Sequence, residues 1–237
     1  MATKYFNFGD VLGYGWRVMK ANLGFFVGLG FVFLIISYLP AIARLAIRAL
    51  HLPKASDITL AILLQILGWV INIVLGIGLI KIALSFCNEQ KPSISTLFDA
   101  WGCFWRYVAA AILYGLIMMA GFILLIFPGI IWAVKFGLCF YFVVDKGLGP
   151  IEALKASSRT TMGAKWGLFG FGILCGLINL LGLLCLIIGI FATYPTVIVA
   201  SALVYRQLLA QTPELAEFGI AAPIAAPNIE PSPNKQE

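Results

Sequence analysis

The sequence predicts an all-α fold: a polytopic transmembrane helical bundle with about six spans. Hydrophobic residues make up 62% of the 237 residues and charged residues only 11%, whereas an average soluble domain is about 25% charged. A soluble fold this apolar could not cover its surface with polar groups, so much of that surface must face lipid. The apolar residues also fall into runs of about 20, the length that an α-helix needs to cross a bilayer.

Six such runs place a transmembrane helical domain at residues 1–210. The predicted spans are 23–42, 58–80, 107–126, 130–144, 166–184 and 189–209. The last two come from one uncharged stretch of about 40 residues, twice the length of a spanning helix, so we expect a tight hairpin there. Residues 211–237 are rich in Pro, Ala and Glu, which predicts a disordered cytoplasmic tail.

The basic residues predict the orientation of the spans. With the N-terminus inside, twelve Lys and Arg residues lie on the N-terminal side of the membrane, whereas Arg44, Arg48 and Lys54 lie on the other side. Lys135 joins these three if its long side chain reaches the outer headgroups. Cytoplasmic loops carry the excess of Lys and Arg. Both termini are therefore expected in the cytoplasm.

Three segments that precede predicted spans have one apolar helical face. Apolar residues recur at helical spacing in the segments that begin near Phe8 and Ile94, and the third segment, 149–163, opens with Pro150, which favours the first turn of a helix. We predict three cytoplasmic amphipathic helices, each followed by a transmembrane hairpin, which would be a threefold repeat. The alternative is that a helix entering a membrane commonly has an amphipathic lead-in.

Four polar residues within the predicted spans form a candidate intramembrane polar site: Lys135, Gln65, Asn72 and Asn179. An ionisable residue inside a span is a functional candidate, although Lys135 could instead extend to the headgroups. Intramembrane amides commonly hydrogen-bond between helices, and the alternative is that they line a polar cavity.

Two further groups of residues are candidates for contact with other membrane components. Lys155, Arg159 and Lys165 are candidate contacts for anionic lipid headgroups, unless they form a solvated cytoplasmic face. Two pairs of glycines, each four residues apart, are candidates for close helix packing, either within the bundle or with another subunit: Gly24 with Gly28, and Gly172 with Gly176.

The residue types that carry catalysis or bind metals are sparse. The five cysteines show no CxxC spacing, and His51, the only histidine, lies outside the predicted spans. We therefore predict no metal site and no cofactor. Asp145 and Glu152 are the nearest approach to an acid–base pair, but nothing in the sequence fixes them together. We predict that the protein is not an enzyme.

Short motifs recur between residues 8 and 209: Trp16, Lys20, Asn22, Phe127-Pro128-Gly129-Ile130, Glu152-Ala153-Leu154, Ser157, Gly163, Trp166, Tyr194-Pro195 and Tyr205. Together they resemble a group of bacterial six-span proteins that look related to the membrane domain of glycerophosphoryl diester phosphodiesterases. The resemblance implies a six-span fold in a bacterial inner membrane. It does not imply phosphodiesterase activity, which belongs to a separate soluble domain.

The leading functional hypothesis is a non-catalytic membrane protein that packs with, stabilises or assembles other membrane components. Glycine-rich spans and the scarcity of polar chemistry favour it. The alternative is a small transporter or channel for a lipophilic or amphipathic solute. The expected partners are membrane lipids and other membrane protein subunits. Nucleic acid is not expected, because the basic residues flank apolar runs and form no polar groove.

Overall fold

The computed structural model describes residues 4–48, 54–97, 101–124, 126–185, 189–213 and 215. Of these residues 87% are helical and none lies in a strand, which confirms the all-α fold class. In chain order the elements are α1 (Phe8–Ala21), α2 (Leu23–Arg48), α3 (Lys54–Cys87), the short 3-10 helices η1 (Ile94–Leu97) and η2 (Trp101–Cys103), α4 (Phe104–Leu124), α5 (Ile126–Phe136), α6 (Cys139–Lys146), α7 (Pro150–Thr160), α8 (Lys165–Leu184) and α9 (Ile190–Ala210). The predicted tail beyond residue 215 lies outside the described residues.

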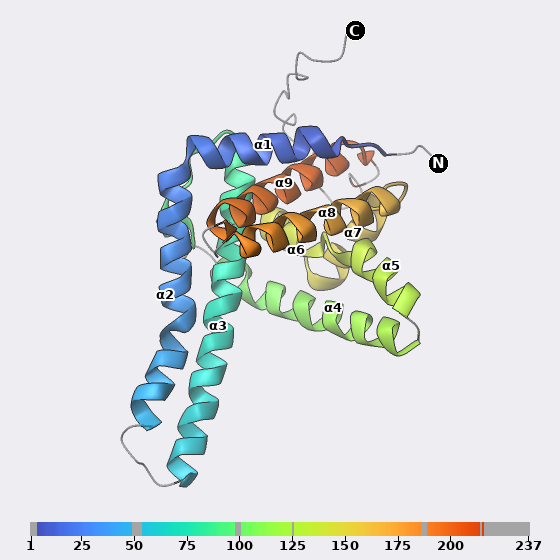
Figure 1. The fold of residues 1–237 in the computed structure, drawn as a ribbon. Coiled ribbons are helices and arrows are strands. Elements are labelled where there is room, and N and C mark those ends of the chain that lie inside the picture. The colour runs from blue at the N-terminus through green and yellow to red at the C-terminus, as the bar shows by residue number, and fades with distance from the viewer. Residues whose placement is uncertain are drawn as a thin grey trace.

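The longest elements, α2 and α3, form an antiparallel pair that extends well beyond the other helices (Figure 1). Helix α1 turns away from the start of α2 at Asn22 and runs alongside α9. Helices α4 and α5 form a second hairpin, and α8 and α9 form a third.

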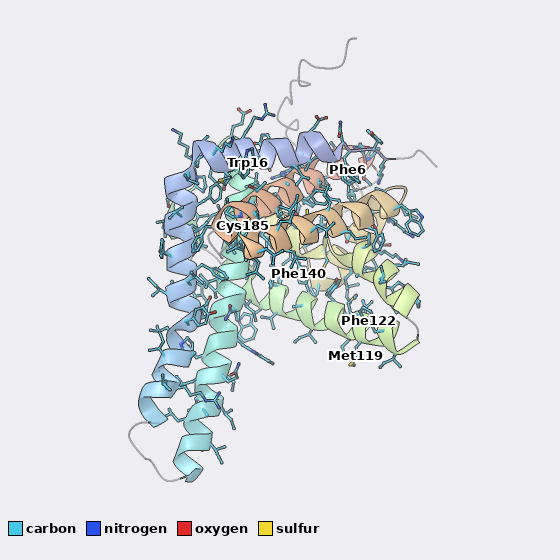
Figure 2. All side chains as sticks on the ribbon, in the orientation of Figure 1. Phe6, Trp16, Met119, Phe122, Phe140 and Cys185 are labelled. Atoms are coloured by element: carbon cyan, nitrogen blue, oxygen red, sulfur yellow. The ribbon has the colours of Figure 1, made fainter. Side chains whose placement is uncertain are left out.

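Five segments are long and apolar enough to cross a membrane. They are Leu23–Leu45, Ile58–Cys87, Ile94–Ile123, Pro128–Lys146 and Lys165–Leu184, and the third of them includes residues 98–100, which the structure does not describe. Large apolar side chains on α4, such as Met119 and Phe122 (Figure 2), are half exposed, as a lipid-facing surface requires. The chain is therefore a multi-pass membrane protein, and five of the six predicted spans coincide with these segments.

Helix α9 covers the sixth predicted span but is not among the five segments. Polar residues such as Thr196, Ser201 and Arg206 lower its hydropathy, and its second half is almost wholly buried. It packs against α1, α2, α3 and α8. These contacts make α9 the central helix of the fold. A helix covered by protein on most sides needs fewer apolar residues than one that faces lipid, which explains its lower hydropathy.

The predicted span at 130–144 is not one continuous helix, which corrects the sequence analysis. Helix α5 ends at Phe136, α6 begins at Cys139, and Gly137 and Leu138 between them form a turn. A Cβ on Gly137 would lie 2.9 Å from the carbonyl oxygen of Ala133, so only glycine fits this backbone path without rearrangement.

Two of the three predicted amphipathic segments are α-helices. Helix α1 buries Val11 and Met19, and α7 begins with Pro150 as predicted. The described residues of the segment from Ile94 form the 3-10 helices η1 and η2 before α4 begins, rather than an α-helix. Residues 98–100, between η1 and η2, lie outside the described part of the chain.

Each of these three segments packs against the hairpin of a different unit. Helix α1 precedes the α2–α3 hairpin but lies on α9, where Gly15 faces Ala200. The η1 segment precedes the α4–α5 hairpin but lies on α3, where Leu97 contacts Gly78. Helix α7 precedes the α8–α9 hairpin but lies on α4, α5 and α6. This cyclic order of contacts is the arrangement that a threefold repeat would produce.

Candidate functional site: a basic hollow between α5 and α7

Helix α7 forms one wall of the hollow, and local sequence features fix where this helix begins. Gly149 precedes the helix in an extended conformation, and Pro150 has the backbone angle that a first helical residue needs. The Glu152 carboxylate accepts a hydrogen bond of 3.2 Å from the Gly149 N–H, which caps the helix start. Five residues on one face of α7 are buried: Ala153, Leu154, Ala156, Ser157 and Thr160. The opposite face carries the charges.

Two hydroxyl groups join α7 to the break between α5 and α6. The carbonyl oxygen of Lys135 accepts hydrogen bonds from Ser157 Oγ at 2.9 Å and from Thr161 Oγ1 at 3.2 Å. The last carbonyls of a helix have no donor within the helix. Ser157 and Thr161 provide that donor, so α5 can end inside the protein without leaving an unsatisfied carbonyl.

The side chains beside this junction surround a hollow of about 360 Å³. Its lining includes three cationic side chains, Lys135 from α5 and Lys155 and Arg159 from α7, together with the hydroxyl-bearing Ser158. No carboxylate is among the described lining residues. The remaining walls are the apolar side chains Phe136, Ile151 and Leu154.

This combination of groups suits an anion with an apolar body. Ammonium, guanidinium and hydroxyl groups donate hydrogen bonds to phosphate oxygens, and the cations also attract the phosphate charge. Lys135 Nζ lies 4.9 Å from the centre of the Phe136 ring, which holds this cation at the wall of the hollow. Ile151 is 61% exposed, so its apolar side chain is accessible at the edge of the site.

Lys165, the third predicted headgroup contact, lies in a separate hollow of about 540 Å³ together with Lys4 and Trp166. Lys4 Nζ donates to the carbonyl oxygens of Arg159 and Thr160, each at 3.1 Å, and ties the chain's N-terminal segment to the end of α7. The structure therefore brings Lys155 and Arg159 together but does not bring Lys165 into the same hollow.

The sequence left two readings of Lys135 open, and in one of them its side chain extends to the headgroups on the side of the membrane opposite Lys155 and Arg159. In the structure Lys135 lines the same hollow as both of these residues. The break after Phe136 explains the difference, because it lets α7 pack beside α5. Gln65, Asn72 and Asn179, which were grouped with Lys135 in the predicted intramembrane polar site, do not line this hollow.

Gln65, Asn72 and Asn179 have separate environments. Gln65 and Asn72 are exposed on α3, and Asn72 Nδ2 donates to the Gly68 carbonyl of its own helix at 2.8 Å. Asn179 on α8 has a buried Oδ1 atom with no hydrogen-bond partner among the described residues. These amides therefore do not assemble into one polar cavity with Lys135.

The predicted helix-packing glycines also differ from expectation. A Cβ placed on Gly24, Gly28, Gly172 or Gly176 would meet no described atom within 4 Å, so none of the four permits a close helix contact inside this chain. The close contacts occur at other glycines, among them Gly15, Gly78 and Gly121. Contact with another subunit, the second reading of these pairs, stays a prediction.

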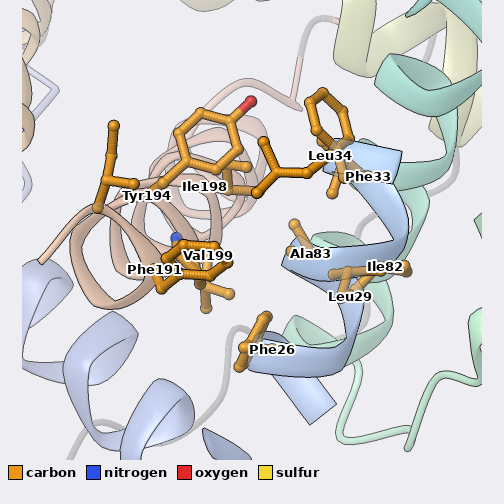
Figure 3. A pocket seen from close by; sticks show the side chains of 14 residues that line it. Phe26, Leu29, Phe33, Leu34, Ile82, Ala83, Phe191, Tyr194, Ile198 and Val199 are labelled. Atoms are coloured by element: carbon orange, nitrogen blue, oxygen red, sulfur yellow. The ribbon is translucent and has the colours of Figure 1, made fainter. Parts of the chain in front are cut away.

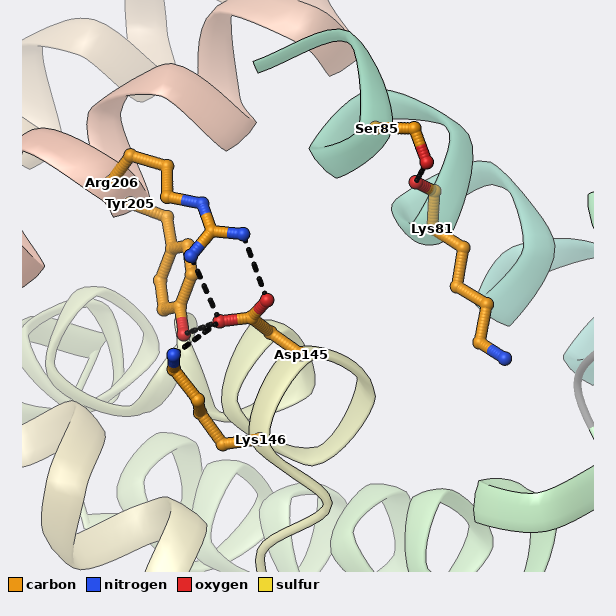
Figure 4. Close-up of polar contacts among 6 residues, drawn as sticks. All are labelled: Lys81, Ser85, Asp145, Lys146, Tyr205 and Arg206. Atoms are coloured by element: carbon orange, nitrogen blue, oxygen red, sulfur yellow. Dashed lines mark hydrogen bonds and ion pairs between the residues drawn. The ribbon is translucent and has the colours of Figure 1, made fainter. Parts of the chain in front are cut away.

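A buried ion pair between α6 and α9 was missed at the sequence level (Figure 4). The Asp145 carboxylate accepts hydrogen bonds from both terminal nitrogens of Arg206 and from the hydroxyl of Tyr205, the last at 3.0 Å. The one signal of this ion pair in the sequence was Arg206, a single charge at the end of an otherwise uncharged run. Glu152, which the sequence analysis considered with Asp145 as an acid–base pair, instead caps α7.

Among the described residues, no group of three or more His, Cys, Asp or Glu side chains could hold a metal ion. The chain was also compared with known proteins. It matches no family model, no curated protein and no solved structure. The resemblance to phosphodiesterase membrane domains thus stays a prediction.

Proposed function

We propose that this chain is a non-catalytic membrane protein that packs with and stabilises other membrane components, and that one of these is an anionic phospholipid. The observation that carries the proposal is the hollow that Lys135, Lys155 and Arg159 line together with the hydroxyl-bearing Ser158 and three apolar side chains. The phosphate would bind the three cations, and the apolar walls would contact the start of the acyl chains.

The lipids that stay bound through purification test this proposal. Protein extracted from membranes containing phosphatidylglycerol and phosphatidylcholine is purified in mild detergent, and the retained lipids are quantified by mass spectrometry. The wild type should retain phosphatidylglycerol selectively, and Lys155→Gln/Arg159→Gln should lose that selectivity. The matched control is Arg17→Gln/Lys91→Gln, which removes the same charge from residues that do not line the hollow. Equal retention by both double variants would reject the hollow as the lipid site.

We also propose a bacterial inner membrane as the location, with both termini in the cytoplasm. The unequal distribution of Lys and Arg supports this orientation. Placing Lys135 beside Lys155 strengthens it, because Lys135 then joins the basic side. Alkaline phosphatase, which is active only outside the cytoplasm, should be active when inserted between α2 and α3 and inactive when fused after Glu237. The reverse pattern would invert the topology.

The alternative function, a carrier for a lipophilic or amphipathic solute, is favoured by the break between α5 and α6. Interrupted transmembrane helices form the substrate sites of many transporters, and this break adjoins the basic hollow. Flux of a lipophilic organic anion into vesicles containing the protein is the measurement. A carrier should lose flux in Lys135→Ala and retain it in Lys91→Ala. Unchanged flux in Lys135→Ala would reject the hollow as a transport site.

A further inference from the structure

A third pocket, distinct from the two hollows described above, lies where the α2–α3 hairpin meets the start of α9. It encloses about 340 Å³ and is partly open to its surroundings. Figure 3 shows side chains from α2, including Phe26, Leu29 and Phe33, on one side of it and Phe191 and Tyr194 from α9 on the other. Its volume lies near the lower end of the range of about 300–1,000 Å³ that is typical of small-molecule sites.

Small and rigid residues keep this space open. Gly30 faces Phe191 so closely that a Cβ at this position would lie 2.7 Å from the ring. Ala83 contributes only a methyl group from α3. Pro195 has no N–H for the helical hydrogen bond to the preceding turn, so α9 is less regular at the point where it borders the pocket.

The chemistry of the lining excludes water as the natural occupant. Every described lining side chain is apolar except that of Tyr194, which is 43% exposed. A water molecule needs two to four polar partners, and an apolar cavity without them stays dry or takes up an apolar guest. The Tyr194 hydroxyl offers one polar group in the described lining of an otherwise hydrocarbon-like space.

We propose that this pocket holds one hydrocarbon chain of a membrane lipid. Two of its walls come from α2 and α3, which are long and apolar enough to span the membrane, so bilayer lipid is the medium around it. A transmembrane helix about 10 Å across is too wide for a space of this volume, which argues against another protein segment. The Tyr194 hydroxyl can donate a hydrogen bond to an ester carbonyl of the same lipid.

Chain-specific photolabelling tests this proposal. The protein is placed in phosphatidylcholine vesicles that contain a phosphatidylcholine with a diazirine on one acyl chain, irradiated, and digested for mass spectrometry. Phe26 and Leu29 are only 3% and 4% exposed, so lipid on the outer surface alone would leave them unlabelled. We expect both to be labelled in the wild type, together with the outward-facing Ile35. Labelling of Ile35 without labelling of Phe26 and Leu29 would overturn the proposal.

Two variants that fill the space provide an independent result. Leu34→Trp acts at a lining position that is 39% exposed, and Ala83→Leu acts at a buried one. Each should reduce the labelling of Phe26 and Leu29 several-fold while Ile35 stays labelled. The control Ala109→Trp changes an exposed position on α4 and should alter neither. Undiminished labelling of Phe26 and Leu29 in Leu34→Trp would also overturn the proposal.

The experiment is separable from the test of the basic hollow, because phosphatidylcholine has no net charge. Lys155→Gln/Arg159→Gln should leave the labelling of the pocket unchanged. Labelling that vanished in this variant would assign the bound chain to the lipid held by the basic hollow and would reject the pocket as an independent site.

Discussion

Arg206 on α9 and Asp145 on α6 are joined by two hydrogen bonds, one to each carboxylate oxygen. Nη2 lies 2.9 Å from Oδ1 and Nη1 lies 3.2 Å from Oδ2, and the two side chains are only 7% and 11% exposed. A two-point contact of this kind fixes the relative orientation of both groups. It therefore constrains how α9, the most buried helix, packs against α6.

Removing one partner of this pair should be costly. Asp145→Leu should lower the free energy of unfolding by about 3–5 kcal/mol, because Arg206 would stay buried without a counter-charge. Asp145→Leu/Arg206→Leu should recover most of that loss. Reversible unfolding in mixed micelles measures both values. A double variant no more stable than the single one would show that the buried charge is not the cause.

Lys146 is the matched control for the same carboxylate. Its Nζ lies 3.5 Å from Asp145 Oδ2, and its side chain is 24% exposed. An ion pair with this exposure contributes at most about 1 kcal/mol, so Lys146→Ala should change stability little.

The two hydroxyls at the break between α5 and α6 make a second prediction. Ser157→Ala and Thr161→Val should each lower the free energy of unfolding by about 0.5–1.5 kcal/mol, and the double variant should cost more than their sum, since it leaves the Lys135 carbonyl without either donor. Thermal unfolding in detergent measures the effect. Ser158→Ala is the control, because Ser158 makes neither bond. Additive losses would mean that another donor replaces the two hydroxyls.

Two glycines on α1 form a matched pair. A Cβ on Gly15 would overlap the backbone carbonyl oxygen of Thr196 on α9, whereas a Cβ on Gly13 would meet no described atom within 4 Å. Gly15→Ala should therefore separate α1 from α9 and cost about 1–3 kcal/mol. Gly13→Ala should be neutral or stabilising by up to about 1 kcal/mol, because alanine favours the helix. Protease cleavage within α1 measures the separation, and equal cleavage of both variants would contradict the packing.

Tyr14 predicts a pH dependence. Its hydroxyl donates to the Phe86 carbonyl at 3.0 Å, and burial, with smaller effects from Cys87 and Glu89, raises the pKa of Tyr14 from 10.0 to about 12. A raised pKa stabilises the folded state while the phenol is protonated, and that stability is lost as the pH rises from 10 toward 12. Melting temperatures of the wild type and Tyr14→Phe should therefore converge over this interval. A constant difference would contradict the pKa shift.

The sequence predicted the helices well because apolar run length and helical periodicity are local properties. Runs at 23–42 and 166–184 needed no knowledge of neighbours, and Pro150 marked the start of α7 correctly. The break at Gly137 was not predictable in the same way. Glycine is common in this sequence, and the donors that satisfy the Lys135 carbonyl, Ser157 and Thr161, lie 22 and 26 residues further along the chain.

The candidate site was predicted in pieces but not as a whole. Lys135, Lys155 and Arg159 were each singled out, yet Lys135 was grouped with Gln65 and Asn72 because all three lie in apolar runs. Which polar side chains meet depends on how α7 folds back on α5, which is a tertiary contact that run length does not encode. Asp145 and Arg206 were missed for the same reason, since they lie 61 residues apart.

The cyclic packing of α1, η1 and α7 has a consequence for the order of assembly during synthesis. The η1 and α7 segments find their docking sites on helices that the ribosome has already made. Helix α1 is made first, but its site is α9, the last helix of the described chain. Until α9 has been synthesised, the apolar face of α1 has no protein partner. An amphipathic helix in this state is expected to lie in the membrane interface. Docking of α1 on α9, which completes the cyclic set of contacts, is thus a late and long-range event. A nascent chain that stops before α9 would leave α1 undocked.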